Sequence, residues 1–250
     1  MTQNLALVAE ALNASARDAD IAARINAARA RIEGRMVFTT SFGLEDQMVT
    51  HAIARSGADI EIVTLDTGRM FPETYDVWAA TEKRYGLRIA AFHPKAEAVE
   101  ALVARQGING FYDGLEARKS CCAVRKVEPL GRALAGAGAW VTGLRAGQSA
   151  ARQATPFAEA DAARGLIKLN PIHDWDAATL NDHVRALEIP YNALHDRGFP
   201  SIGCQPCTRA VRVGEHERAG RWWWEQSDQE CGLHVAKPAA KPAEKPSRAA

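Results

Sequence analysis

The sequence predicts an α/β fold in which a parallel sheet is sandwiched by helices and followed by a C-terminal extension. Two observations support this prediction: short apolar runs alternate with amphipathic stretches, and polar loop motifs follow the apolar runs. Strands that alternate with helices of roughly 10–15 residues are typical of βαβ units, whose sheets are covered on both faces. Such sheets bind ligands at the carboxyl ends of their strands, so the polar loops indicate the expected site.

The elements are expected in the order of successive α/β units. Residues 1–34 are alanine-rich with apolar residues at three- and four-residue steps, which predicts one or two amphipathic helices. Strands are expected at residues 36–40, 60–65, 87–92, 139–143 and 166–169. Further helices are expected at 46–55, 73–85, 95–105, 124–134 and 175–187, the last one capped by Asp174. The α/β domain should span 35–235, and the Lys-Pro repeats of 236–250 should form a disordered tail.

The composition limits the classes of partner. The chain has 250 residues, of which 47% are hydrophobic, and a formal net charge of +1. The length and the hydrophobic content allow a full core in one or two domains. We expect no nucleic-acid partner, because broad nucleic-acid binding usually requires a basic surface. Anions should instead be recognised by local clusters of arginine and lysine.

The sequence predicts neither an export signal nor a membrane span. The first residues lack a cationic lead and a long apolar run, and no segment offers about 18 apolar residues in succession. We therefore expect a cytoplasmic protein that does not bind membranes. In that reducing compartment, clustered cysteines are more often metal ligands or catalytic thiols than disulfides.

The first polar loop, Ser41-Phe42-Gly43, lies between the first expected strand and its helix. Backbone N–H groups and a hydroxyl at a helix N-terminus can hold a phosphate. Many such turns carry serine and glycine for geometry alone. Phe42 occupies a position that is glycine in loops closing round a pyrophosphate, so this pocket would suit a mononucleotide better than a triphosphate.

Four of the five cysteines form two pairs. Cys121 and Cys122 are adjacent, and Cys204 and Cys207 form a C-x-x-C turn. Together they offer a four-sulfur shell for either zinc or an iron–sulfur cluster. Consecutive side chains tend to diverge, so an adjacent pair fits two corners of a cluster better than one tetrahedral ion. This geometry favours a [4Fe-4S] cluster over zinc.

The fifth cysteine, Cys231, is a candidate nucleophile because it is unpaired and close to a histidine. His234 follows three residues later, where a helical turn would place it on the same face. The cations that could surround an anion are Arg218, Arg221, Lys126 and those of the loop 145–152. Most arginines and lysines are solvated surface charges, which is the alternative for this group. We expect the triplet Trp222-Trp223-Trp224 in the core or in a lid.

Together these motifs resemble those of the thioredoxin-dependent adenylylsulfate (APS) reductases, whose family also contains the 3′-phosphoadenylylsulfate (PAPS) reductases. The resemblance covers about residues 35 to 235. The motifs are Thr40-Ser41-Phe42-Gly43 with Glu45-Asp46, residues 65–74, Cys121-Cys122 with Arg125-Lys126, Thr142-Gly143-Leu144-Arg145 with Gln148-Ser149, Cys204-x-x-Cys207, and Glu230-Cys231-Gly232-Leu233-His234. The resemblance implies a fold similar to the adenine nucleotide alpha hydrolases, with a modified ATP pyrophosphatase loop.

The resemblance also implies an activity, the reduction of APS to sulfite and AMP in assimilatory sulfate reduction. The Cys231 thiolate would attack the substrate sulfur, and thioredoxin or glutaredoxin would release sulfite from the resulting S-sulfocysteine. One [4Fe-4S] cluster would be held by the four paired cysteines, without changing its redox state. The implied catalytic residues are Cys231, His234, Lys126, Arg218 and Arg221. The implied substrate-binding residues are Ser41, Phe42, Gly43, Asp46, Leu65, Thr67, Gly68, Arg125, Gly143, Arg145 and Arg152.

Three alternatives remain. A PAPS reductase or a dual-specificity enzyme is the alternative within the family, although four cluster cysteines mostly accompany APS reduction. A cluster- or zinc-stabilised nucleotide sensor is an alternative from another class, but a sensor does not need Cys231 beside cationic groups. ATP-dependent thiolation of RNA on the same fold is disfavoured by Phe42 and by the near-neutral net charge. A homo-oligomer is compatible with the sequence.

Overall fold

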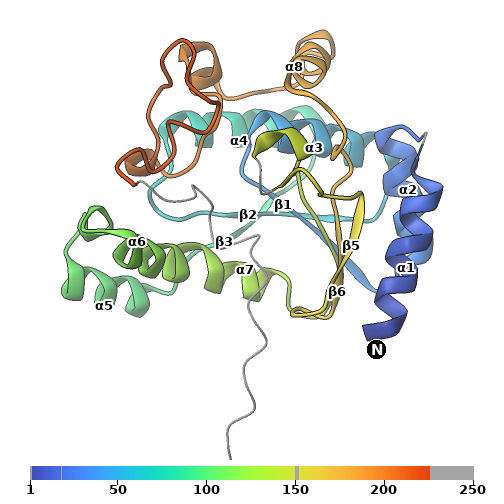
Figure 1. Cartoon of the computed structure of the whole chain (residues 1–250), viewed down its shortest axis with the longest axis horizontal. Coiled ribbons are helices and arrows are strands. Elements are labelled where there is room, and N and C mark those ends of the chain that lie inside the picture. The colour runs from blue at the N-terminus through green and yellow to red at the C-terminus, as the bar shows by residue number, and fades with distance from the viewer. Residues whose placement is uncertain (1, 18, 150–151, 226–250) are drawn as a thin grey trace, which may run out of the picture.

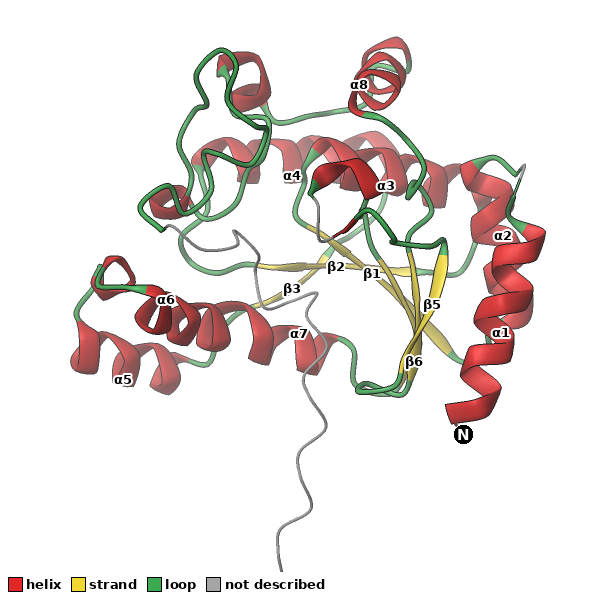
Figure 2. Cartoon of the chain, in the orientation of Figure 1, coloured by secondary structure: helices red, strands yellow, loops and turns green. Residues whose placement is uncertain are grey.

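The structure is a computed structural model that describes residues 2–17, 19–149 and 152–225 (Figure 1). Cys231, His234 and the expected tail at 236–250 lie outside these residues. The described part of the chain folds as a sheet with helices on both faces, as the sequence predicts (Figure 2).

The sheet has six strands, and the order of its strands reverses beside β1. In spatial order the strands are β3 (Ala90–Phe92), β2 (Glu61–Leu65), β1 (Arg35–Thr40), β4 (Ala137–Val141), β6 (Leu166–Leu169) and β5 (Ala158–Asp161). All neighbours are parallel except β5, which runs antiparallel to β6. The chain proceeds from β1 outward through β2 to β3, and β4 then returns to the other side of β1. Open α/β sheets bind ligands at such a reversal.

Helices cover both faces of this sheet. They are α1 (Thr2–Ser15), α2 (Ile21–Arg31), α3 (Leu44–Ser56), α4 (Pro72–Tyr85), α5 (Ala96–Gln106), α6 (Leu115–Cys122), α7 (Glu128–Ala133) and α8 (Ala177–Ala186). Figure 2 shows α3 and α4 above the sheet and α5, α6 and α7 below it. Helix α1 contacts β5, and α2 and α8 contact α3, so the N-terminal helices extend the same layer.

The alternation of side chains along β1 explains why both faces are covered. Successive side chains of a strand point to opposite faces. Met36 and Phe38 lie in one buried apolar cluster, which includes Val49 of α3, and Val37 lies in another, which includes Leu130 of α7. The central run Met36-Val37-Phe38 of β1 is thus apolar because both faces of the strand are buried there.

Three strands differ from the prediction. The strand expected at 139–143 is β4, Ala137–Val141, so Thr142 and Gly143 follow it. The strand expected at 87–92 is only Ala90–Phe92, because the N–H of Ile89 donates to Glu82 Oε1 at 2.8 Å and is not available to the sheet. Strand β5 was not predicted, since its sequence, Ala-Glu-Ala-Asp, contains no large apolar side chain. As an antiparallel edge strand it needs no continuous apolar run.

Two helix boundaries also differ. The double cysteine was expected just before a helix, but it forms the end of α6, and a π-helical segment, Ala123–Val127, continues from it into α7. Helix α8 begins at Ala177, three residues after the expected cap, Asp174. Asp176 is the actual cap, accepting the Thr179 N–H at 2.7 Å, because the Asp174 carboxylate pairs with Arg24 at 2.6 Å.

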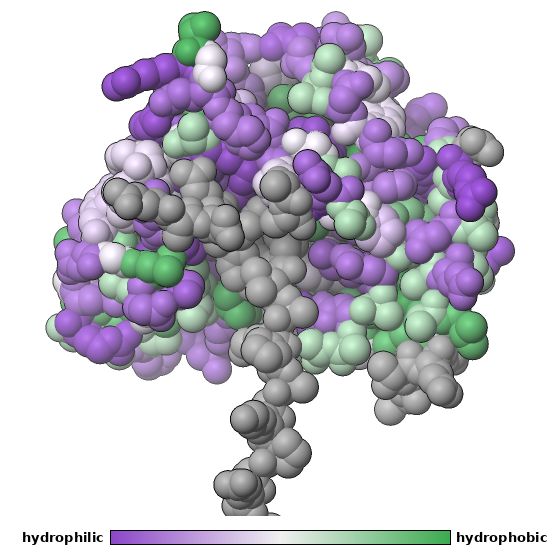
Figure 3. All heavy atoms as spheres, in the orientation of Figure 1, coloured by the Kyte–Doolittle hydropathy of each residue, from purple (hydrophilic) through white to green (hydrophobic). Residues whose placement is uncertain are grey.

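The surface is mostly hydrophilic on the face shown in Figure 3, with hydrophobic residues between the hydrophilic ones. This agrees with the 24% of charged residues in the chain. Among the described helices, none has the length and apolar character needed to cross a membrane.

Candidate active site

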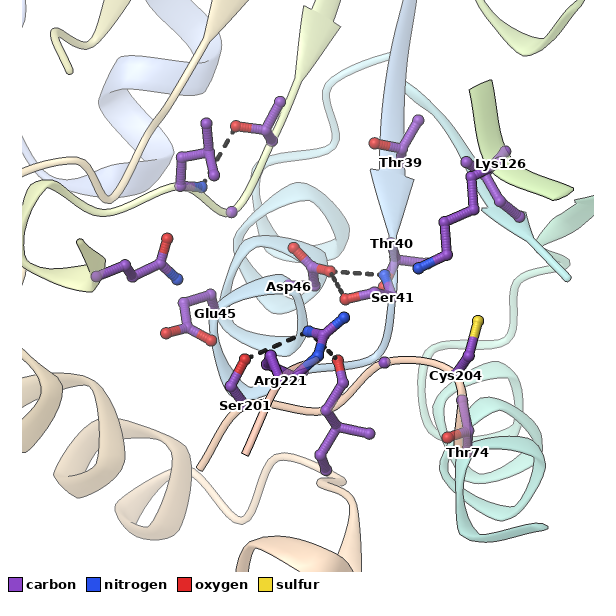
Figure 4. A pocket seen from close by; sticks show the side chains of 18 of the residues that line it. Thr39, Thr40, Ser41, Glu45, Asp46, Thr74, Lys126, Ser201, Cys204 and Arg221 are labelled. Carbon is purple, nitrogen blue, oxygen red and sulfur yellow. Dashed lines mark hydrogen bonds between the residues drawn. The ribbon is translucent and has the colours of Figure 1, made fainter. Parts of the chain in front are cut away.

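A cavity of about 210 Å³ lies at the carboxyl ends of β1, β2 and β4 (Figure 4). Thr40 ends β1, Leu65 ends β2 and Thr142 follows β4, and all three line the cavity. The cavity therefore lies where the order of strands reverses, as expected for this fold class. The site residues predicted from the sequence that line it are Ser41, Gly43, Asp46, Leu65, Thr67, Lys126, Gly143, Arg152, Arg218 and Arg221.

The loop that was expected to hold a phosphate binds a carboxylate of the protein itself. The backbone N–H and the hydroxyl of Ser41 donate to Asp46 Oδ2 at 2.6 and 2.7 Å (Figure 4). Burial raises the pKa of Asp46 to about 6, while the hydrogen bonds from Ser41 oppose this rise. Because Asp46 already uses these donors, the cavity presents a hydrogen-bond acceptor at this point rather than a vacant anion cradle.

Gly143 allows this arrangement because it has no side chain. A Cβ built on Gly143 would overlap Asp46 Oδ1. The backbone of Gly143 also contributes a hydrogen bond that lowers the pKa of Asp46. Gly143 thus permits close approach of the carboxylate, a common reason for glycine beside a site.

Phe42 does not line the cavity with its side chain. The ring is 1% exposed and stacks on Trp78, with 5.5 Å between the ring centroids. Its φ of 62° is in the left-handed region, which is uncommon for a residue other than glycine. This agrees with the observation from the sequence that Phe42 stands where related loops have glycine.

Four cations and three carboxylates line the cavity. The cations are Lys126, Arg152, Arg218 and Arg221, and the carboxylates are Asp46, Glu45 and Glu217. The three arginines are at most 9% exposed. Buried cations gathered in a cavity at the carboxyl ends of parallel strands are suited to an anionic ligand. Figure 4 shows Lys126 and Arg221 directed toward the loop that carries Ser41.

Three predicted binding residues act from outside the cavity wall. Arg145 pairs with Glu45 at 2.7 Å and with Glu217 at 3.6 Å, and so orients two of the carboxylates. Arg125 donates to the Thr67 carbonyl at 2.7 Å. Gly68, with a φ of 68°, donates its N–H to Asp66 at 2.8 Å and shapes the loop after β2. These residues support the wall instead of forming it.

The four paired cysteines surround a second, smaller cavity of about 20 Å³. The other residues that line it are Arg69, Phe111, Arg118, Arg125, Lys126, Pro206 and Trp222. Burial raises the pKa of the Cys207 thiol to about 12, and the nearby Cys204 adds to this rise. Burial also raises the pKa of Cys121. In the described residues, no three His, Cys, Asp or Glu side chains are arranged to hold a single metal ion.

The residues of this second cavity fit a group that binds thiolates. Four sulfurs face one space, and four cations, Arg69, Arg118, Arg125 and Lys126, stand around it to offset negative charge. Metal-bound cysteines are deprotonated, so binding of such a group would overcome the raised thiol pKa values. Cys204, Lys126 and Trp222 line both cavities, so the two sites share a wall.

The comparisons with known proteins agree with this geometry. Residues 35–210 match the model of the phosphoadenosine phosphosulfate reductase domain. The adenosine 5′-phosphosulfate reductase of Sinorhizobium fredii (strain USDA 257) is 55% identical over 240 residues, which are 96% of this chain and 95% of that protein. The chain belongs to the phosphoadenosine phosphosulfate reductase family.

Solved structures confirm the fold of this family member. A phosphoadenylyl-sulfate (PAPS) reductase from Candida auris, solved as a phosphate complex, is 27% identical with a TM-score of 0.68. The alignment covers 81% of this chain and 96% of that one. An FMN adenylyltransferase from Candida glabrata is 16% identical with a TM-score of 0.51, over 95% and 85% of the two chains, and shares the fold alone. The predicted sheet sandwiched by helices is therefore confirmed.

Two residues that line the cavity, His195 and Glu217, were not predicted from the sequence. His195 lines the cavity of about 210 Å³, and neither of its ring nitrogens has a hydrogen-bond partner among the described residues. Burial lowers its pKa, whereas Glu45 raises it. Burial also raises the pKa of Glu217. His195 lies in the short 3₁₀ helix Ala193–Arg197 and Glu217 lies in a turn, and a lone histidine or glutamate in such a segment carries no pattern that sequence could reveal.

Proposed function

We propose that this protein reduces adenosine 5′-phosphosulfate (APS) to sulfite and AMP, with electrons from a thioredoxin or a glutaredoxin. The observation that carries the proposal is a cavity with four cations at the carboxyl ends of the strands, sharing a wall with four cysteines. The relative from Sinorhizobium fredii that is 55% identical carries the name of this reaction. The reducing cytoplasm is the compartment we propose for it, because it keeps the thiols of enzyme and partner reduced.

The reaction proceeds in three displacements that balance atoms and electrons. The Cys231 thiolate attacks the sulfur of the mixed anhydride, so a sulfur–sulfur bond forms, the sulfur–oxygen bond to AMP breaks, and AMP leaves with the electron pair. A thiolate of the partner then attacks Sγ of Cys231 and expels sulfite with the electron pair of that sulfur–sulfur bond. The second partner thiol displaces Cys231 from the mixed disulfide. The partner is oxidised to a disulfide and supplies two electrons to the sulfur that leaves as sulfite.

The cations of the cavity lower the electrostatic barrier to the first displacement. A thiolate and a sulfate are both anionic, so their approach requires neutralisation of charge. Lys126, Arg218 and Arg221 would bind the phosphosulfate and compensate this charge in a buried site, where electrostatic interactions are strong. His234, which lies outside the described residues, would help to keep Cys231 as the thiolate.

The cofactor of the proposal is a [4Fe-4S] cluster held by Cys121, Cys122, Cys204 and Cys207. When bound, it would supply negative charge and rigid cross-links between segments far apart in the sequence. Lys126 lines both cavities, so its ammonium group would offset charge on both sides of the shared wall. The sequence argument that adjacent cysteines suit two corners of a cluster supports this choice over zinc.

APS is the preferred substrate in this proposal. The four-cysteine set favours it, and the carboxylates of Glu45, Asp46 and Glu217 in the cavity provide a second argument. An additional 3′-phosphate would bring a further negative charge among these acceptors, whereas ribose hydroxyls can donate to them. PAPS reduction with equal or higher efficiency is the alternative.

The proposal is tested by steady-state kinetics of anaerobically purified protein with reduced thioredoxin and either APS or PAPS. We expect sulfite and AMP in equal amounts, and a kcat/KM for APS well above that for PAPS. Cys231→Ser is the matched control and should form neither product. If wild-type protein with APS forms no sulfite although it contains iron and acid-labile sulfide, the proposed activity is wrong.

A further inference from the structure

The guanidinium of Arg221 is held mainly by packing. Its Nη1 lies 3.4 Å from both Ser201 Oγ and the Ile202 carbonyl, which are long contacts. Its buried Nε has no hydrogen-bond partner among the described residues. A Cβ built on Gly203 would overlap the guanidinium, so Arg221 lies directly against the bare backbone there.

On another side, Arg221 packs against Trp222. The Cζ of Arg221 is 4.7 Å from the centroid of the indole, a distance typical of a cation–π interaction. Trp222 is 1% exposed, has a φ of 45°, and lines both cavities. A tryptophan in this uncommon backbone conformation requires support from its surroundings.

A buried ion pair supplies this support. Arg118 of α6 lies over Trp222 with its Cζ 4.6 Å from the ring centroid. Its Nε and Nη2 donate to Glu225 Oε1 and Oε2 at 2.9 and 2.7 Å, and the two side chains are 2% and 4% exposed. The N–H of Glu225 donates to the Trp222 carbonyl at 2.9 Å. The ion pair therefore clamps Trp222 to the helix that carries Cys121 and Cys122.

We propose that Arg118 and Glu225 are positioning residues for substrate binding. Their ion pair holds Trp222, and Trp222 together with Gly203 holds the guanidinium of Arg221 toward the anionic part of the substrate. The inference rests on the proposed function, because it takes Arg221 as a ligand of the phosphosulfate. Arg221 is thus oriented by residues on the side of the shared wall that faces the four cysteines.

Two variants disturb Arg221 from opposite sides. Glu225→Gln removes the charge of the clamp and leaves the shape. Gly203→Ala places a methyl group where the guanidinium lies, and it does not touch the ion pair; the φ of Gly203 is outside the left-handed region, so alanine is compatible with the backbone. Hydrogen bonds to charged groups contribute enough that losing the Arg221 contact should weaken binding of APS by about tenfold or more.

The experiment measures APS affinity by calorimetry in a Cys231→Ser background, which prevents turnover, and combines each variant with Arg221→Met in a double-mutant cycle. Iron content and melting temperature are measured on every sample. We expect Glu225→Gln, Gly203→Ala and Arg221→Met each to weaken APS binding about tenfold, which is about 1.4 kcal/mol. In the Arg221→Met background, the other two changes should have less than about a twofold effect. The control Asp174→Asn breaks the Arg24–Asp174 pair, whose residues line neither cavity, and should leave APS affinity unchanged.

The outcomes separate this inference from the proposed function. If Glu225→Gln lowers only the melting temperature and APS affinity stays at the parent value, the pair is structural and the inference is wrong. It is equally wrong if the losses from Glu225→Gln and Arg221→Met add in full. If the Cys231→Ser parent does not bind APS at all, the proposed function itself fails. If the parent binds APS, Arg118→Lys should weaken that binding, because lysine lacks the planar fork that pairs with both oxygens of Glu225.

Discussion

Ionisation of Asp46 should destabilise the folded protein as the pH rises. Burial raises the pKa of this carboxyl from 3.8 to about 6. A carboxyl whose pKa is raised by folding is favoured in its protonated form, so the free energy of unfolding falls as the pH rises from the unfolded pKa through the folded one. A shift of about two units corresponds to about 3 kcal/mol at 1.36 kcal/mol per unit, of which roughly 2 kcal/mol falls between about pH 4.5 and pH 8.

Asp46→Asn removes this ionisation and keeps the shape of the side chain. The stability of the variant relative to wild type should therefore increase by roughly 2 kcal/mol from about pH 4.5 to pH 8. Urea unfolding followed by tryptophan fluorescence at several pH values measures this difference. Asp176→Asn is the control: hydrogen bonds from Thr179 lower the pKa of Asp176, so its titration lies below this pH range and its effect should be constant across it. A pH-independent difference for Asp46→Asn would refute the reasoning.

Three further substitutions test the two cavities. Gly143→Ala should displace the Asp46 carboxylate from Ser41 and weaken APS binding several-fold in calorimetry, because the added Cβ overlaps Asp46 Oδ1; unchanged affinity would contradict this. His195→Phe keeps an aromatic ring and removes both nitrogens. Its APS affinity should be severalfold lower, because the imidazole lines the cavity with nitrogens that can contact the substrate; equal affinity would exclude that contact. Cys204→Ser should lose iron, acid-labile sulfide and sulfite formation together, and stoichiometric zinc with negligible iron in anaerobic wild-type protein would contradict the cluster.

Most of the fold could be predicted because it follows from local patterns. The apolar runs of β1 and β2 are buried on both faces, so their sequence alone indicated parallel strands within a sheet. Strand β5 has no such run, since it is an antiparallel edge strand. The cap of α8 was misassigned to Asp174 because its pairing with Arg24, 150 residues away in the sequence, is a tertiary contact that no local pattern reveals.

The site was predictable to the extent that its residues form motifs. The loops after β1, β2 and β4 meet at one cavity, and the two cysteine pairs meet at another, as their positions indicated. Two features of the site depend on tertiary contacts and could not be predicted from the sequence. Ser41 binds Asp46 although the loop is suited to a phosphate, and the tryptophan triplet divides, with Trp222 buried in the shared wall and Trp223 41% exposed.

The central claim is that this chain reduces APS through a covalent intermediate on Cys231. The most direct measurement is a single incubation of anaerobic wild-type protein with APS and without any reductant, which allows only the first displacement, followed by mass spectrometry of its peptides and quantification of AMP. We expect one equivalent of AMP per active site and an added sulfonate group on the peptide that carries Cys231, which reduced thioredoxin then removes as sulfite. Release of AMP while that peptide stays unmodified would contradict the account.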